Sequence, residues 1–345
     1  MRYTCIDSFS GAGGLSLGLS KAGFEILFSF DIDELSIQTQ KLNTKYFAHE
    51  AVCADIIKLD SQKLMNQLGI KRGELTLFAG GPPCQGFSIQ RIGEDSDDRN
   101  NLVFEFMKKV VDFLPRFFLM ENVPGITGKR GKKILENAIS FAEKNGYAIH
   151  RQILDAQEFG VPQRRKRLFI IGERKVDGEL KFNFPKGSTK RITVREVISK
   201  LPIPPTDGKE HEKISLHRSD KLSRINLERI KCLKPGQGRE FLPKELLADC
   251  HKIDSSVIGH RNVYGRMSWD DVAPTITARF DSFTRGLFGH PEQHRSISLR
   301  EGALLQTFPM DFNFCGNKVD VARQIGNAVP PKLAYAIGKK IIQST

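Results

Sequence analysis

The chain has 345 residues, of which 39% are hydrophobic and 27% are charged, a composition typical of a globular protein of roughly two domains. Its 53 basic and 40 acidic residues give a net charge of +13, which favours a polyanionic partner such as nucleic acid or an anionic membrane surface. No apolar run is long enough to span a bilayer, and Asp7 interrupts any signal-peptide core, so we expect a cytoplasmic protein. Six cysteines without a Cys-x-x-Cys pair predict neither a disulfide framework nor a zinc site, and we expect no metal.

A glycine-rich turn lies between the first expected strand, Tyr3–Asp7, and the first expected helix. The turn reads Ser8-Phe9-Ser10-Gly11-Ala12-Gly13-Gly14. Backbone N–H groups at such a turn, together with the amino end of the helix, favour an anion or the polar tail of a cofactor. Ser16 stands where the dinucleotide fingerprint requires its third glycine, which argues against a nicotinamide cofactor.

Acidic residues follow the next two expected strands. Asp31 ends the strand Ile26–Phe30, where a carboxylate can accept both hydroxyls of a ribose, although Asp31 or Asp33 could equally cap the helix that follows. Asp55 and Ile56 follow the third strand and suit a purine, with the carboxylate accepting from an exocyclic amine and the isoleucine packing on the ring. Taken alone, that pair is equally well an ordinary strand end.

Cys84 lies in a loop that follows the apolar run Leu75–Phe78, an expected buried strand. The loop reads Ala79-Gly80-Gly81-Pro82-Pro83-Cys84-Gln85-Gly86-Phe87-Ser88. Rigid prolines before the cysteine and a glycine hinge after it would fix the direction of the thiol, as a nucleophile requires. A buried or idle thiol is the simpler interpretation of a lone cysteine, because free cysteine is among the most buried residue types. The neighbouring motifs must decide between the two.

Two further features lie beyond the cysteine loop. A buried strand, Phe117–Met120, is followed by Glu121, which brings another carboxylate to the same edge of the sheet. The basic run Gln163-Arg164-Arg165-Lys166-Arg167 opens the expected strand Arg167–Ile171. Four consecutive cations are ordinarily a solvated face, but at the start of an internal strand they indicate an anionic neighbour. Helices are expected over residues 101–114 and 132–146.

The composition of the sequence changes near Phe184, where prolines, lysines and arginines replace long apolar runs. A last amphipathic helix, ending near Ile342, has the alternating character of the first half of the chain. We therefore expect an α/β domain made of residues 1–184 together with 323–345. Residues 185–322 are expected to form a second, basic domain of loops and short strands.

The ordered set of motifs resembles that of the bacterial cytosine-5 DNA methyltransferases of restriction–modification systems. The match leaves out roughly residues 186–270 and includes, in chain order, Asp7 to Gly14, Asp31, Asp55-Ile56, Pro82-Pro83-Cys84-Gln85, Glu121-Asn122-Val123, Gln163 to Arg167, Arg300-Glu301, Leu305 to Pro309 and Gly326 to Pro330. The joint order and spacing favour Cys84 as a nucleophile over an idle thiol. The resemblance implies a Rossmann-like methyltransferase domain and a smaller, basic, mostly irregular or β target-recognition domain that includes a hinge.

The resemblance implies transfer of a methyl group from S-adenosylmethionine to C5 of a cytosine in a specific double-stranded DNA sequence, with S-adenosylhomocysteine as product. Cys84 would add to C6 of the base, and Glu121 would share or give a proton at N3. Arg165 and Arg167 would contact O2 and the phosphate of the flipped nucleotide, with Arg167 favoured for the base. No residue stands out to remove the C5 proton, and a water or hydroxide could do so.

The resemblance also implies the parts of a cofactor pocket. Phe9 would stack on the adenine, and the backbone of Gly11, Gly13 and Gly14 would approach the methionine portion. Asp31 would hold the ribose, while Ile32 replaces an aromatic residue that is common in the family, so packing there would be weaker. The remaining contacts would come from Asp55, Ile56, Pro83, Leu102, Asn327 and Ala328.

The target cytosine is inaccessible inside a duplex, so such an enzyme turns it out of the stack. The glycine-hinged run 85–99 would form a lid, and Gln90 is a candidate to enter the vacated space. Arg218, Arg224 and Arg229 are candidates for contacts to bases or phosphates. The family also suggests a cytoplasmic monomer at the nucleoid, with no membrane partner, and a restriction endonuclease that acts on the same site.

Two other hypotheses compete with this one. A tRNA cytosine methyltransferase would share the fold, but this chain has Ser282-Phe283-Thr284 in place of that relative's Cys-Phe-Thr signature. The basic middle domain of this chain is also of a size suited to double-stranded DNA. A DNA-binding protein that has lost catalysis would not need Cys84, Glu121, Arg165 and Arg167 together. Methylation of DNA is therefore the favoured function.

Overall fold

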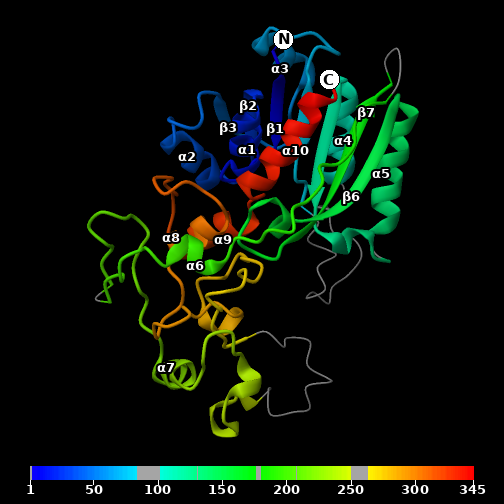
Figure 1. Ribbon diagram of the computed structural model, residues 1–345. Coiled ribbons are helices and arrows are strands. Elements are labelled where there is room, and N and C mark those ends of the chain that lie inside the picture. The colour runs from blue at the N-terminus through cyan, green and yellow to red at the C-terminus, as the bar shows by residue number, and fades with distance from the viewer. Residues whose placement is uncertain (1, 84–101, 130, 176–179, 207, 250–262) are drawn as a thin grey trace. The chain divides into compact units, whose positions relative to one another are not determined.

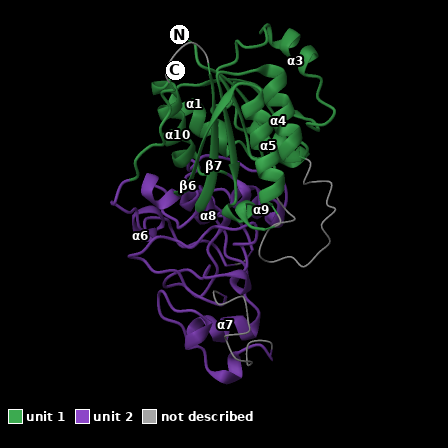
Figure 2. Cartoon of the chain, turned by 90° about the vertical axis from the view of Figure 1, so that its right-hand side faces the viewer, with its two compact units in different colours: residues 1–155, 166–187, 329–345 green, residues 156–165, 188–328 purple. Residues whose placement is uncertain are grey.

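The structure, a computed structural model, describes residues 2–83, 102–129, 131–175, 180–206, 208–249 and 263–345. It divides into two compact units, coloured separately in Figure 2. Unit 1 comprises Met1–Asp155, Lys166–Gly187 and Val329–Thr345, and unit 2 comprises Ala156–Arg165 and Ser188–Ala328. Our expected boundaries had placed all of residues 1–184 and 323–345 in one domain. The segment 156–165 instead leaves the sheet, because Arg164 donates its backbone N–H to the Ala273 carbonyl, 2.9 Å away, within unit 2.

Unit 1 is built on one seven-stranded sheet (Figure 1). Its strands are β1 (Thr4–Ser8), β2 (Glu25–Asp31), β3 (Glu50–Cys53), β4 (Leu77–Gly80), β5 (Phe117–Asn122), β6 (Tyr147–Asp155) and β7 (Lys166–Arg174). They lie in the order β3-β2-β1-β4-β5-β7-β6. The pairs among β1 to β5 are parallel, and β7 runs antiparallel to both β5 and β6. The expected α/β fold is confirmed.

Helices cover both faces of the sheet, as a parallel sheet requires. Those of unit 1 are α1 (Gly14–Ala22), α2 (Glu34–Leu42), α3 (Ser61–Leu68), α4 (Leu102–Phe113), α5 (Lys132–Lys144) and α10 (Pro331–Gln343). Ile6, Phe78 and Phe118 from the central strands form one core with apolar residues of α3, α4 and α5. Asp7 points to the opposite face, where it is hydrogen-bonded to Ser16 of α1. Helix α3 was not among the elements expected from the sequence.

The last helix, α10, packs against α1 (Figure 1). Gly18 lies at the contact, and a Cβ atom built on it would lie 2.4 Å from both the Cβ of Ala334 and the carbonyl oxygen of Pro331. The absence of a side chain at Gly18 therefore lets the two helices approach closely. This contact joins residues near the two ends of the chain within unit 1.

Unit 2 has little regular structure. Its helices are α6 (Val194–Ile198), α7 (Arg224–Lys231), α8 (Leu299–Leu305) and α9 (Lys318–Asn327). Its described single-turn 3₁₀ helices are Ala156–Phe159, Arg239–Phe241, Lys244–Leu246 and Phe283–Arg285, and another in unit 1 spans Pro124–Thr127. The mostly irregular character is as expected, but over the described part of unit 2 the expected short strands are only isolated bridges. Sequence analysis also missed α9, which Asn317 and Asp320 begin with a capping box.

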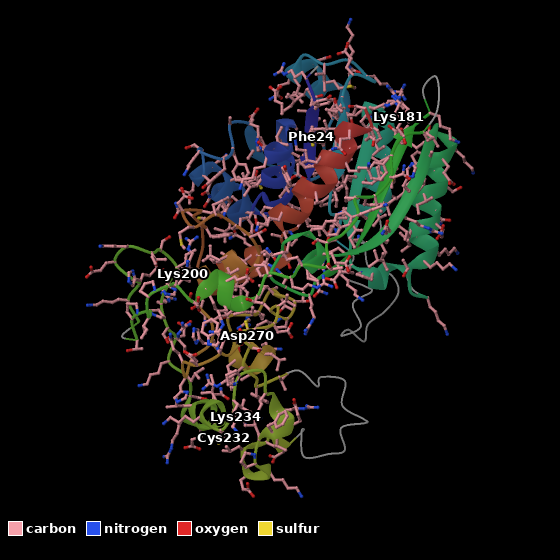
Figure 3. The ribbon with its side chains drawn as sticks, in the orientation of Figure 1. Phe24, Lys181, Lys200, Cys232, Lys234 and Asp270 are labelled. Carbon is pink, nitrogen blue, oxygen red and sulfur yellow. The ribbon has the colours of Figure 1, made fainter. Side chains whose placement is uncertain are left out.

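Buried arginines supply hydrogen-bond donors to the loops of unit 2. Arg266 donates to the carbonyls of Ile230, Leu233, His290 and Gln293 at 2.7–3.2 Å. Arg300 likewise donates to the backbone carbonyls of Ser215, Pro309 and Phe312. Buried carbonyls in loops and in the last turn of a helix need such partners, since leaving them unpaired is costly. By contrast, Lys200, Cys232 and Lys234 are exposed on this unit (Figure 3).

In the described parts of the chain, no helix is long and apolar enough to cross a membrane.

Candidate active site

The residues singled out in unit 1 gather at one edge of the sheet. The parallel strands β1 to β5 all end at this edge, and ligands bind at such edges in open α/β sheets. Because β7 runs in the opposite direction, its first residues reach the same edge. The topology therefore brings Phe9, Asp31, Asp55, Glu121 and Arg167 to one side of unit 1.

The glycine turn after β1 has a strained backbone. Phe9 has a φ of +52°, in the left-handed region that residues other than glycine seldom adopt. Gly13, with a φ of +84°, caps α1, and a Cβ atom on it would lie 2.5 Å from the ring of Phe47. Strain of this kind is concentrated at ligand sites, which favours a binding role for the turn.

Asp31 ties the end of β2 to the glycine turn. One carboxylate oxygen accepts the N–H of Gly11 at 2.8 Å, and the other accepts the N–H of Asp33 at 2.9 Å. Burial raises the pKa of Asp31 from its ordinary value, while these two backbone N–H groups act in the opposite direction. Each oxygen keeps further acceptor capacity, so the carboxylate can still receive ribose hydroxyls.

The alternative that we considered for Asp31, the N-cap position of the next helix, belongs to Asp33. Asp33 occupies the N-cap position of α2 without a side-chain capping bond to the helix backbone, and its carboxylate accepts the Ser36 hydroxyl at 2.6 Å. Asp31 is instead the last residue of β2. The carboxylate of Asp31 is thus available for the turn and for a ligand.

Apolar side chains beside the acidic strand ends are unusually exposed. Ile32 is 71% exposed and Ile57 is 56% exposed, whereas Ile56 is buried in the core. Asp55 accepts the backbone N–H of Ile57 at 3.0 Å. Exposed apolar surface next to carboxylates suits the two faces of a nucleoside, an apolar ring and a polar ribose. Sequence analysis had named Ile56 for the ring and had not considered Ile57.

Glu121 and Arg167 form an ion pair at the same edge. Nε of Arg167 lies 2.8 Å from Oε1 of Glu121, and both side chains are mostly buried. Glu121 is in β5 and Arg167 is in the neighbouring strand β7, so the sheet itself sets their separation. A carboxylate and a guanidinium held side by side can together contact a planar ring that has both acceptor and donor atoms.

The strand that carries Glu121 also holds the segment that leads to Cys84. The side-chain amide of Asn122 donates to the Pro82 carbonyl at 3.0 Å. A Cβ atom built on Gly81 would lie 3.1 Å from Oε2 of Glu121, so the carboxylate lies against this backbone. Cys84 itself, together with the expected lid and Gln90, lies outside the described residues.

Arg165 has different surroundings from Arg167. It belongs to unit 2, is only 1% exposed, and donates to the carbonyls of Ile276, Gly326 and Ala328 at 2.8–3.2 Å. Sequence analysis had paired it with Arg167 as a contact to the flipped nucleotide. The structure places its guanidinium among backbone carbonyls, where it holds the end of α9.

The remaining candidates are divided between the units. Pro83 and Leu102 belong to unit 1 and are partly buried. Asn327, the exposed last residue of α9, and Ala328 belong to unit 2. The carbonyl of Ala328 accepts hydrogen bonds from Arg165 and Gln306. A role for Asn327 and Ala328 in the cofactor pocket stays a prediction.

Two buried polar residues near the turn had been given no role in the sequence predictions. Asp7, in β1, is fully buried, and its Oδ2 accepts the Ser16 hydroxyl at 2.6 Å. Burial raises the pKa of Asp7 to about 7. Gln40, in α2, donates to the Gly11 carbonyl at 2.7 Å. A polar residue within a buried strand was the available signal for Asp7, whereas nothing in the sequence pattern distinguishes Gln40 from Gln38.

Comparisons with known proteins agree on the family of the chain. A family model described as C-5 cytosine-specific DNA methylase matches residues 3–343. The chain is 36% identical over 341 residues to the Type II methylase M.HgiDII of Herpetosiphon aurantiacus, covering 97% of this chain and 94% of that protein. It is also 36% identical to the Type II methyltransferase M1.HphI of Haemophilus parahaemolyticus, with 99% and 87% covered. A solved structure from E. coli, described as a DNA modification methyltransferase encoded within a prophage, superposes with a TM-score of 0.77 at 28% identity, covering 99% of both chains.

Proposed function

Because this chain belongs to the C-5 cytosine-specific DNA methylase family, we propose that it methylates one cytosine within a specific double-stranded DNA sequence by base flipping and covalent addition of Cys84. Its relatives are Type II methyltransferases of restriction–modification systems, so the chain is a cytosine-5 DNA methyltransferase of that type. The proposal adds the mechanism, the residues and the DNA contacts.

S-adenosylmethionine would supply the methyl group as an electrophile. The residues at the sheet edge fit this cofactor, because a carboxylate with spare acceptor capacity lies between a strained glycine turn and exposed apolar side chains. Asp31 would hold the ribose hydroxyls, and Phe9, Ile32 and Asp55 would line the adenine. The backbone of Gly11, Gly13 and Gly14 would lie along the methionine portion.

On the base, the thiolate of Cys84 would form a bond to C6, the electron pair of the C5–C6 double bond would form a C4–C5 double bond, and the electron pair of the C4–N3 double bond would move to N3. Glu121, in its protonated form, would give a proton to N3 and Arg167 would donate to O2. These contacts stabilise the enamine whose C5 takes the methyl group, with S-adenosylhomocysteine as the leaving group. Loss of the C5 proton to water or hydroxide then restores the double bond and expels the thiolate. The observation that carries this proposal is the Glu121–Arg167 pair, lying against the backbone that leads to Cys84.

Arg165 would have a structural role within unit 2. Its guanidinium donates to three carbonyls of unit 2, so we propose that it supports the end of α9, and we assign the base contact to Arg167. Unit 2 would provide the contacts that select the DNA sequence. Within it, Arg224 is exposed, whereas Arg229 is buried and donates to the Leu246 carbonyl. We infer that a restriction endonuclease recognises the same sequence and that the methyltransferase acts as a monomer.

The decisive experiment combines methyl transfer with trapping. Wild-type protein given S-adenosylmethionine with a labelled methyl group should label double-stranded DNA, and Cys84→Ser should abolish labelling while cofactor binding persists. DNA with 5-fluorocytosine at the target position should become covalently attached to the wild type, since fluorine blocks the final elimination. Methyl transfer by the serine variant, or labelling of RNA in place of DNA, would refute the proposal.

A further inference from the structure

A chain of hydrogen bonds runs beneath the glycine turn of unit 1. Nε2 of Gln40 donates to the Gly11 carbonyl at 2.7 Å and to the Ser10 hydroxyl at 2.9 Å. Oε1 of Gln40 accepts the Ser29 hydroxyl at 2.8 Å. Nε2 of His49 lies 2.8 Å from the same Ser29 oxygen. These hydrogen bonds thus connect α2, β2 and the segment before β3 to the glycine turn.

The donors and acceptors of this chain balance. A side-chain amide has two hydrogens, and Gln40 uses both on the turn. The single hydroxyl hydrogen of Ser29 is directed to Gln40, so the Ser29 oxygen accepts from His49, which requires hydrogen on Nε2. Burial lowers the pKa of His49 to about 4, which keeps its ring neutral near pH 7. A chain of donors oriented in one direction therefore ends at the Gly11 carbonyl.

The peptide groups on either side of Gly11 are fixed from opposite ends. Asp31 accepts the Gly11 N–H at 2.8 Å, and Gln40 donates to the Gly11 carbonyl. Gln40 is 1% exposed, so water cannot easily replace it. Gly11 has a φ of +51°, a conformation that the chain would otherwise leave readily because glycine has many alternatives.

We propose that Gln40 is a positioning residue for the cofactor: by holding the Gly11 carbonyl and the Ser10 hydroxyl, it keeps the glycine turn in the shape that binds S-adenosylmethionine. This inference rests on the proposed function, in which the same turn lies along the methionine portion. Ser29 and His49 act through Gln40, because they orient its amide and do not contact the turn through any hydrogen bond described above.

The main test compares two glutamine substitutions on the same helix. Gln40→Met keeps the length of the side chain and removes all three of its hydrogen bonds. Gln38→Met makes the same change at an exposed residue two positions earlier. Gln40→Met should weaken binding of S-adenosylmethionine by about tenfold in equilibrium dialysis and raise its KM similarly, with kcat within about twofold. Gln38→Met should match the wild type.

A second readout uses the protein without cofactor. Hydrogen exchange of the backbone amides in the peptide that contains residues 8–17 should be faster in Gln40→Met than in Gln38→Met or the wild type. A role confined to overall stability would instead lower the amount of active enzyme and leave KM unchanged. Equal cofactor binding by both methionine variants, or an unchanged exchange rate, would overturn the inference while leaving the methyltransferase proposal intact. Failure of the wild type to bind the cofactor would overturn both.

Coupling through Gln40 has its own test. Ser29→Ala removes one hydroxyl and is the milder change; it should weaken cofactor binding by about threefold. In the double variant with Gln40→Met, binding should be no weaker than in Gln40→Met alone, because Ser29 then has no amide to orient. If the double variant instead lost affinity by the product of the two single losses, Ser29 would not act through Gln40.

Discussion

Two arginines separated by one residue show how burial decides what a side chain can do. Arg165 is surrounded by backbone carbonyls of unit 2, while Arg167 pairs with Glu121 at the end of the sheet in unit 1. A guanidinium that satisfies buried carbonyls contributes to stability, and one that pairs with a carboxylate at a ligand edge can exchange that partner for substrate. Their roles should therefore separate experimentally.

Alanine substitutions should make that separation visible. Arg165→Ala takes this donor from the carbonyls of Ile276 and Gly326, whereas Ala328 keeps Gln306, and should lower the free energy of unfolding by about 3 kcal/mol. Arg167→Ala should destabilise the protein less and reduce kcat on the order of 100-fold, because a donor to the base is lost. Urea denaturation and single-turnover methyl transfer measure the two effects. A fully stable Arg165→Ala enzyme without turnover would reverse our assignment.

Asp7 is a second residue whose behaviour depends on burial. Its pKa is raised to about 7, chiefly by burial, whereas the unfolded chain has an ordinary aspartate. Between pH 4 and pH 7 the folded state therefore holds a proton that the unfolded state has lost. Asp7 therefore destabilises the folded state least at low pH. Its destabilising effect grows as the pH rises toward about 7 and then levels off.

Asp7→Asn should remove this pH dependence while keeping an acceptor for the Ser16 hydroxyl. The free energy of unfolding of the variant relative to the wild type should rise by about 2 kcal/mol between pH 5.5 and pH 8. Urea titrations at several pH values measure the difference. Ser16→Ala serves as a control, because it removes the hydrogen bond but not the carboxyl group. A difference that does not change with pH would show that Asp7 is ionised throughout.

At the scale of elements, the close contact of α1 and α10 places the start of α1, and with it the glycine turn, in a fixed position. Gly18 allows this contact because no Cβ atom stands between the helices. The amino end of α1 follows directly from the turn, so a shift of α1 would move the expected cofactor contacts. The carboxyl-terminal helix thus supports the site without belonging to it.

Gly18→Ala should be destabilising although alanine is the better helix former. The new Cβ atom would lie 2.4 Å from Ala334 and from the Pro331 carbonyl, and backbone would have to move. Overpacking should outweigh the propensity gain of about 1 kcal/mol, for a net loss of about 2 kcal/mol. Thermal denaturation should show this loss, whereas Ser20→Ala, at an exposed position of α1, should change little. A stabilised Gly18→Ala protein would show that α10 can move aside.

At the scale of the whole molecule, part of the positive charge behind the net charge of +13 is buried and cannot contact DNA. Arg165, Arg229, Arg239, Arg266, Arg295 and Arg300 are buried in unit 2. Most of these donate to loop carbonyls, and Arg295 pairs with Glu301. Arg224 has a side chain that is 95% exposed, although its Nε lies 3.3 Å from Oε1 of Glu228, and it is a candidate for a phosphate contact. The basic composition of the middle of the chain therefore serves two purposes, internal support and attraction of a polyanion.

Salt dependence of DNA binding should distinguish these purposes. Each phosphate contact contributes about −0.9 to the slope of log K against log salt concentration. If Arg224 contacts a phosphate, Arg224→Ala should make the slope shallower by about that amount and weaken binding to all sequences alike. Lys21→Ala, which removes an equally positive and exposed residue of unit 1, is the matched control. An unchanged slope for Arg224→Ala would exclude a phosphate contact there.

The sequence by itself determined the elements that carry the candidate site. Short apolar runs ended by turn residues located β1, β2, β4 and β5, and polarity at their ends marked Asp31 and Glu121. These signals are local, because hydrophobic runs and turn residues act over a few positions. The family motifs added Cys84, whose surroundings lie outside the described residues.

Only the tertiary structure decided which polar groups meet. Arg165 bonds to the carbonyl of Gly326, 161 residues away, and Gln40 reaches the glycine turn 29 residues before it. Such partners are brought together by packing of the whole unit, so no local pattern separates Arg165 from Arg167 or Gln40 from Gln38. The free energy of a buried polar group depends on its partners and on the exclusion of water, and both are properties of the folded chain.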